Sequence, residues 1–247
     1  TSVFFIFETL GIAFSFKRFV LAGVTTYIAF YVAGWVISDH ALYKMPVTTW
    51  SLQVLWVIPI LVLVLTPLAY GFARLTKQAT AHRIKDQRIF LTLPLVFLFL
   101  AVLAQNLPHL LGNGRMVAQE VINGISWKTA LVLFVLKALV VLLTLWAGAY
   151  GGTLTPSFAL GMAGAALLTL AFGFEGLSTI LLIGAVCFLT VTLNAPFSAT
   201  GLVIGFTGQG LEALPYLFLT AFLAHALGRA LDRVSWKGLS RRKVRAS

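Results

Sequence analysis

Charged residues are scarce in this chain, and they make up only 10% of its 247 residues. A soluble domain carries about a quarter charged residues, so the composition argues against a soluble fold. The one cysteine, Cys187, excludes an intrachain disulfide. The four histidines are scattered, and no Ser/His/Asp set, metal-ligand spacing or phosphate-binding loop is present. We therefore expect no enzyme, no cofactor and no metal site.

Long apolar runs dominate the chain, which is 60% hydrophobic. A helix needs about 20 apolar residues to cross a bilayer. Runs that reach or approach this length cover residues 19–38, 50–73, 89–111, 127–149, 156–174, 177–193 and 213–231. These runs predict an all-α, polytopic membrane protein with one transmembrane domain over residues 1–247 and the lipid bilayer as its surroundings.

The basic residues gather in three places, although the net charge of +11 could also suggest a nucleic-acid-binding protein. They lie at 17–18, at 74–88 and at 229–245, while the intervening loops are nearly balanced. Alternating loops of this kind follow the positive-inside rule. We therefore expect the three clusters to be cytoplasmic, with a basic cytoplasmic tail at 232–247, and no nucleic-acid partner.

Glycine and proline interrupt the second half of the chain at membrane depth. The interruptions lie in "GGTLTPSFALG" (151–161), "TLNAPFS" (192–198) and "FTGQGLEALP" (206–215), and the helix expected at 196–206 is too short to span. Non-helical backbone at this depth survives only inside protein or along a cavity. Such broken helices are typical of ion sites in transporters, so we expect tilted, broken and re-entrant helices.

The stretch at 151–156 has the composition of an anion site. Thr155 is a suitable N-cap and Pro156 suits the first helical position. The free N–H groups and the positive dipole of a helix start attract anions, and Gly151 and Gly152 would let the backbone approach an ion closely. A glycine-rich bend that only lets two helices pack is the alternative.

Four stretches carry a family resemblance, one of which is "LGNGRMVAQEVINGISWKTALVLFVLKALVVLLTLWAG" (111–148), with a basic residue at Lys137. "AYGGTLTPSFALGMAGA" resembles the GGxFxPxLxxG signature of the CLC chloride channels and transporters, and "FFIFET" and "TLNAPFSATGLVIGFTG" resemble other segments of that family. The resemblance implies chloride transport by a homodimer with one pore per subunit. It also implies that the amides of Thr153 and Leu154 hold the anion, with Leu154 in place of the usual Phe. The expected location is a bacterial inner membrane, with a cytoplasmic C-terminus.

The resemblance covers about the last three-fifths of a CLC membrane domain. Two further anion-binding signatures of the family, one of which carries the gating glutamate, are not found in this sequence. A non-conducting fragment or dimerisation remnant is therefore one alternative to a transporter. An unrelated membrane enzyme acting on lipid phosphates is another, although we find no converging acidic or histidine residues for it.

Four further residues enter through the resemblance or through their position in apolar runs. Glu8 matches a family glutamate, and Thr9 stands where proton-coupled members often have a second one. Both are candidates for gating or a proton path, and Thr9 suggests that the protein either is not a standard proton exchanger or uses another proton route. Trp236 is a pore-lining candidate in place of the family's tyrosine. Lys137 is expected to pair structurally with a carboxylate or with helix C-terminal carbonyls, because charges inside a membrane are costly.

Overall fold

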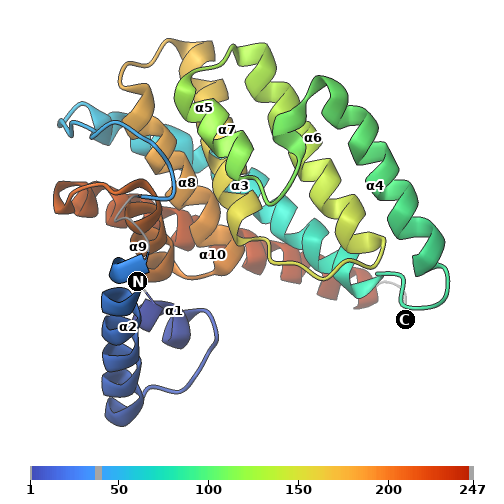
Figure 1. The fold of residues 1–247 in the computed structure, drawn as a ribbon, viewed down its shortest axis with the longest axis horizontal. Coiled ribbons are helices and arrows are strands. Elements are labelled where there is room, and N and C mark those ends of the chain that lie inside the picture. Colours follow the sequence, from blue (N-terminus) through green and yellow to red (C-terminus); the bar gives the residue numbers. More distant parts are fainter. Residues whose placement is uncertain (1, 37–40, 245–247) are drawn as a thin grey trace.

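The computed structural model describes residues 2–36 and 41–244, and the side chains of residues 3–35 and 41–234 (Figure 1). All regular elements in these residues are helices, which confirms the all-α prediction. In chain order they are α1 (Ser2–Glu8), α2 (Phe16–Val36), α3 (Val54–Ala81), α4 (Ile89–Asn106), η1 (Pro108–Leu110), α5 (Arg115–Asn123), α6 (Trp127–Trp146), α7 (Leu154–Phe172), α8 (Leu177–Leu193), α9 (Pro196–Thr207), η2 (Leu211–Ala213) and α10 (Leu214–Val244).

Six helical segments within the described residues are long and apolar enough to cross a membrane. They are α2, α3, α4, α6, α7 and the stretch Leu211–Val234. The predicted run at 177–193 forms α8, which has 17 residues and is shorter than the other six. The protein is therefore a multi-pass helical membrane protein.

The centre of the molecule is the pair α7 and α8, which are apolar on all sides and are surrounded by α3, α6 and α10 (Figure 1). A helix without a polar face belongs in the interior of a bundle. Small residues let the two backbones approach closely. A Cβ atom added at Gly161 would lie 2.5 Å from the carbonyl oxygen of Gly184.

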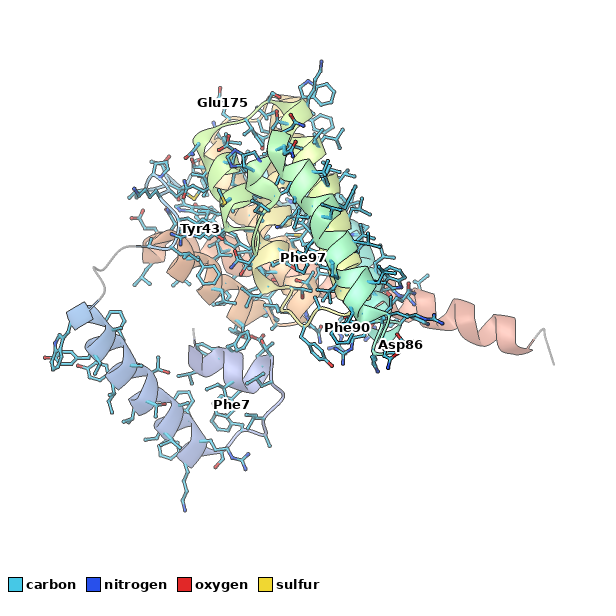
Figure 2. The ribbon with its side chains drawn as sticks, turned by 45° about the vertical axis from the view of Figure 1, so that its right-hand side comes forward. Phe7, Tyr43, Asp86, Phe90, Phe97 and Glu175 are labelled. Carbon is cyan, nitrogen blue, oxygen red and sulfur yellow. The ribbon has the colours of Figure 1, made fainter. Side chains whose placement is uncertain are left out.

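Helix α4 lies at the outer side of the bundle and presents apolar side chains away from it. Phe90 is 82% exposed and Phe97 is 50% exposed, and Figure 2 shows both along the same helix. Exposed aromatic and aliphatic side chains over a spanning helix are expected on a surface that faces lipid. Helix α3 continues through Pro59 and Pro67, as tolerated in membrane helices.

Helix α2 extends away from the bundle, and α1 lies between α2 and α9, with which it is in contact (Figure 1). The apolar run at 2–14 is helical only to Glu8, and Gly11 adopts a left-handed φ of +64°. Phe7 packs against Phe14 and Phe19 and so joins the two helices. Very little of α2 is buried, so its apolar surface is open on most sides.

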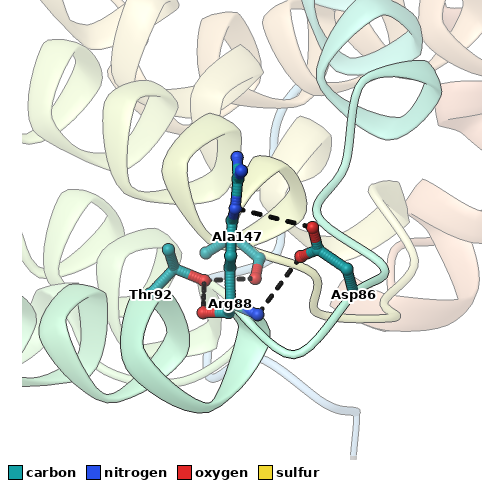
Figure 3. Close-up of polar contacts among 4 residues, drawn as sticks. All are labelled: Asp86, Arg88, Thr92 and Ala147. Atoms are coloured by element: carbon teal, nitrogen blue, oxygen red, sulfur yellow. Dashed lines mark hydrogen bonds and ion pairs between the residues drawn. The ribbon is translucent and has the colours of Figure 1, made fainter.

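The connection between α3 and α4 is fastened to the end of α6. The N–H of Ile84 donates to the carbonyl of Trp146 at 3.0 Å, and Thr92 Oγ1 lies 3.2 Å from the carbonyl oxygen of Ala147. Figure 3 shows Thr92 together with the Asp86–Arg88 pair that closes the turn before α4. Gly148 is required at this junction because its φ is +116° and an added Cβ would lie 2.6 Å from Ile89. These contacts fix the chain just before residue 151.

Candidate functional site

Helix α7 begins two residues earlier than the sequence suggests. Its first residue is Leu154 and its N-cap is Thr153, which makes no side-chain capping bond. The prediction of Thr155 as N-cap and Pro156 as first helical residue is therefore wrong, and residues 151–153 before the helix are irregular backbone. Pro156 is tolerated as the third residue of α7 because N–H groups in the first turn of a helix have no intrahelical acceptor. The lack of an N–H on proline therefore costs no helical hydrogen bond.

The first turn of α7 offers backbone donors. The N–H of Ser157 bonds to the carbonyl of Thr153 at 2.9 Å, whereas the hydrogen bonds found among the described residues do not use the N–H of Leu154 or Thr155. A Cβ added at Gly151 or Gly152 would meet no atom within 4 Å. The open space means that helix packing does not require glycine at either position. Neither residue has a positive φ, so the backbone conformation does not require glycine there either. The alternative of a bend that only serves packing therefore has no contact to support it.

A cavity of about 510 Å³ opens onto this turn. Its wall includes Gly151, Gly152 and Thr153, together with Lys77 of α3 and Thr192 of α8. Leu154, Thr155 and Pro156 do not belong to the wall. The Leu154 side chain instead packs against the apolar core. The structure thus brings three of the six predicted anion-site residues to one cavity.

The contribution of α3 to this cavity was missed in the sequence. Ala73, Thr76, Lys77 and Thr80 all lie in the wall, and their spacing of three and four residues places them on one face of the helix. Lys77 is exposed and brings a positive charge to the same space as the start of α7. Polar residues on one face of an otherwise apolar helix could have indicated that this face lines a cavity. The basic cluster at 74–88 instead served only to predict which loops are cytoplasmic.

Glu8 lies at a different helix start. Its Oε1 accepts from the N–H of Phe197 at 3.1 Å, and its Oε2 accepts from the N–H and the hydroxyl of Ser198 at 2.6 and 2.7 Å. A carboxylate at this position satisfies the free donors of α9 and complements its dipole. The Thr9 hydroxyl is buried and has no hydrogen-bond partner among the described residues. Neither residue lines the cavity beside Gly151.

Lys137 is buried within α6, where its side chain is 1% exposed. Its Nζ donates to the carbonyl oxygens of Leu110 and Gly112 at 2.9 and 2.7 Å. These carbonyls lie at the end of η1 and just after it. The lysine therefore pairs with carbonyls at a helix C-terminus, which is one of the two structural roles predicted for it. The buried ammonium is compensated by hydrogen bonds to carbonyl dipoles.

The remaining predicted site residue is Trp236, which belongs to α10, but its side chain lies outside the described residues. The expected tail at 232–247 continues α10 as far as Val244. Among the described residues, no three His, Cys, Asp or Glu side chains converge as metal ligands would.

The fold matches solved structures of ion-coupled antiporters. One is described as a slow cyanobacterial Cl⁻/H⁺ antiporter, with 19% identity, a TM-score of 0.80, and coverage of 93% of this chain and 56% of that one. Another is a CLC-type fluoride/proton antiporter, with 18% identity, a TM-score of 0.71, and coverage of 92% and 57%. The chain thus spans just over half the length of each.

No curated protein matches the chain. The family described as "Voltage gated chloride channel" matches residues 1–229, which is nearly all of the sequence. That match and the CLC-type fold agree with the "GGTLTPSFALG" resemblance. The chain therefore belongs to the voltage-gated chloride channel family.

Proposed function

We propose that this chain forms part of a chloride transport pathway across a membrane. The observation that carries the proposal is the cavity whose wall joins Gly151, Gly152 and Thr153 to Lys77. In this proposal the amides of Thr153 and Leu154 bind the anion, and the two glycines leave the backbone open to it. The Cl⁻/H⁺ and fluoride/proton antiporters that share the fold support a halide as the transported ion.

The chemistry of the cavity suits an ion that must bind and leave. Backbone amides at a helix start hold an anion by partial charges, which bind it more weakly than a buried cation would. Lys77 is exposed, so solvent reduces the strength of its attraction. Conduction requires binding that is strong enough for entry and weak enough for release. Lys77 then raises the local concentration of anions, and the amides select the position.

The orientation and assembly belong to the same proposal. The basic clusters at 17–18, 74–88 and 229–245 favour a cytoplasmic C-terminus, and we infer a bacterial inner membrane. An exposed aromatic group joins α1, α9 and α10, where Phe197 lies 5.9 Å from Phe4 and 5.4 Å from Phe222 between ring centroids. A homodimer would cover this group. A non-conducting dimer remains the alternative, because the chain spans 56–57% of the solved structures.

Chloride efflux from liposomes that contain the purified chain tests the transport proposal. The variant Gly152→Val adds a side chain into open space, so the fold should persist while the anion loses access to the amides. The matched control is Gly23→Val on α2, which also meets open space but lies outside the cavity. We expect chloride-selective efflux that Gly152→Val reduces at least tenfold and Gly23→Val preserves. No efflux from the helical, dimeric chain would favour the non-conducting alternative.

The external pH followed in the same experiment tests proton coupling. Thr9 cannot carry a proton as a carboxylate can, and Glu8 is bonded at the start of α9. We propose that chloride flux in this protein is not coupled to protons through these two residues. A proton flux that accompanies chloride and is abolished by Glu8→Gln would contradict this part of the proposal.

A further inference from the structure

A second cavity, of about 370 Å³, lies between α3, α8 and α10. Arg74 and Lys77 contribute to its wall from α3, Thr190 from α8, and Arg229 from α10. It shares Ala73 and Lys77 with the cavity beside Gly151, but it contains no residue of the 151–153 turn. It is therefore a separate space next to the proposed anion site.

The wall of this second cavity carries an excess of positive charge. Arg74, Lys77 and Arg229 are cationic at neutral pH, and His225 lies among them. Among the described residues of the wall one carboxylate is present, that of Asp232, whose Oδ1 accepts a hydrogen bond from the hydroxyl of Tyr70 at 2.8 Å. Arg74 also lies over the Tyr70 ring at 5.6 Å. Lys77 and Arg229 alone bring two positive charges to this wall, and Asp232 already accepts a hydrogen bond, so the wall favours a ligand of more than one negative charge.

Thr190 supplies an independent observation. It is 0% exposed and belongs to the wall, yet its Oγ1 has no hydrogen-bond partner among the described residues. Buried threonines of neighbouring helices donate to the carbonyl four residues earlier, as Thr169 of α7 does to Ala165 and Thr207 of α9 does to Val203. A buried hydroxyl without a partner is unfavourable, so its position in this wall indicates a missing acceptor.

We propose that this cavity binds a phosphate group. A phosphate presents several strong acceptor oxygens, which match the guanidinium of Arg229, the ammonium of Lys77 and the hydroxyl of Thr190. The group can belong to free inorganic phosphate or to the headgroup of an acidic phospholipid, because the cavity borders helices expected to span the membrane. The proposal does not depend on chloride transport, since Arg229 and Thr190 lie outside the first cavity.

Calorimetric titration of the full chain in detergent with inorganic phosphate, at constant ionic strength, tests binding. Arg229→Gln should weaken phosphate binding at least tenfold. Arg233→Gln is the matched control, because it removes the same charge from the exposed surface of the same helix outside the wall. Thr190→Val is the second variant, since it deletes an unpartnered hydroxyl and should leave the thermal stability unchanged or higher while it also weakens binding.

The source of the phosphate is distinguished by native mass spectrometry with phosphatidic acid, using diacylglycerol as the lipid without phosphate. Retention of phosphatidic acid that is lost in Arg229→Gln and Thr190→Val supports a lipid headgroup. Binding of inorganic phosphate alone, with the same variant pattern, supports a soluble ligand. The proposal is overturned if neither probe binds, or if Arg233→Gln weakens binding as much as Arg229→Gln does.

Discussion

Lys137 places an ammonium group inside the helix bundle, where an ionised side chain is costly unless hydrogen bonds compensate it. Two carbonyl oxygens, of Leu110 and Gly112, accept from its Nζ. The sequence predicted this structural pairing, because a lysine in the middle of an apolar run has few alternatives. The sequence could not identify the carbonyls, which are 25 and 27 residues away in the chain.

The variant Lys137→Met should lower the stability of the protein. It keeps most of the length of the side chain but removes the donor to two carbonyl oxygens, of which that of the buried Leu110 is left unsatisfied at a cost of about 1–3 kcal/mol. Thermal unfolding in detergent, followed by circular dichroism, measures the effect. Lys128→Met on the exposed surface of the same helix should change little, and an equal effect of the two variants would contradict the structural role of Lys137.

The carboxylate of Glu8 joins α1 to the first turn of α9 through hydrogen bonds. Glu8→Ala removes the acceptor for Phe197 and Ser198 and should destabilise this contact by about 0.5–2 kcal/mol, as the loss of a helix cap does. Faster hydrogen exchange of the amides of these two residues would show the loss. Glu175→Ala, at an exposed position between α7 and α8, is the control. Unchanged exchange in Glu8→Ala would contradict the capping role.

The boundaries of the helices show what local sequence signals can predict. The runs at 127–149, 156–174 and 177–193 correspond closely to α6, α7 and α8, because length and hydropathy alone define a spanning helix. The start of α7 was wrong by two residues, since Thr and Pro favour a helix start at more than one register. Helix α10 extends beyond the expected end at 231, because the basic residues that follow contain no proline to stop it.

The close contact between α7 and α8 provides a prediction at the element scale. Gly184→Val should strongly destabilise the fold, because an added Cβ would overlap Ala165 and the carbonyl of Gly161. Overpacking of this kind costs about 1–3 kcal/mol or more. Gly71→Val on α3, where an added Cβ meets no atom within 4 Å, is the control in the same thermal unfolding assay. Equal melting temperatures for the two variants would contradict this contact.

The candidate site exists only at the scale of the whole molecule. Lys77, Thr153 and Thr192 belong to three helices or their ends, and packing of α3, α7 and α8 brings them to one cavity. The sequence pointed to residues 151–156 because two glycines and a proline interrupt an apolar run there. It could not identify Lys77 or Thr192 as neighbours of that turn, because their convergence depends on tertiary contacts.

The most direct test of the anion site is the position of bromide, a heavier halide, in crystals of the protein. Anomalous scattering would locate the ion without reference to transport. We predict a bromide peak in the cavity, within hydrogen-bond distance of the backbone amide of Thr153 or Leu154, and its loss in Gly152→Val crystals. Bromide bound only elsewhere, or no bromide in this cavity at saturating concentration, would contradict the proposal that the start of α7 holds the transported anion.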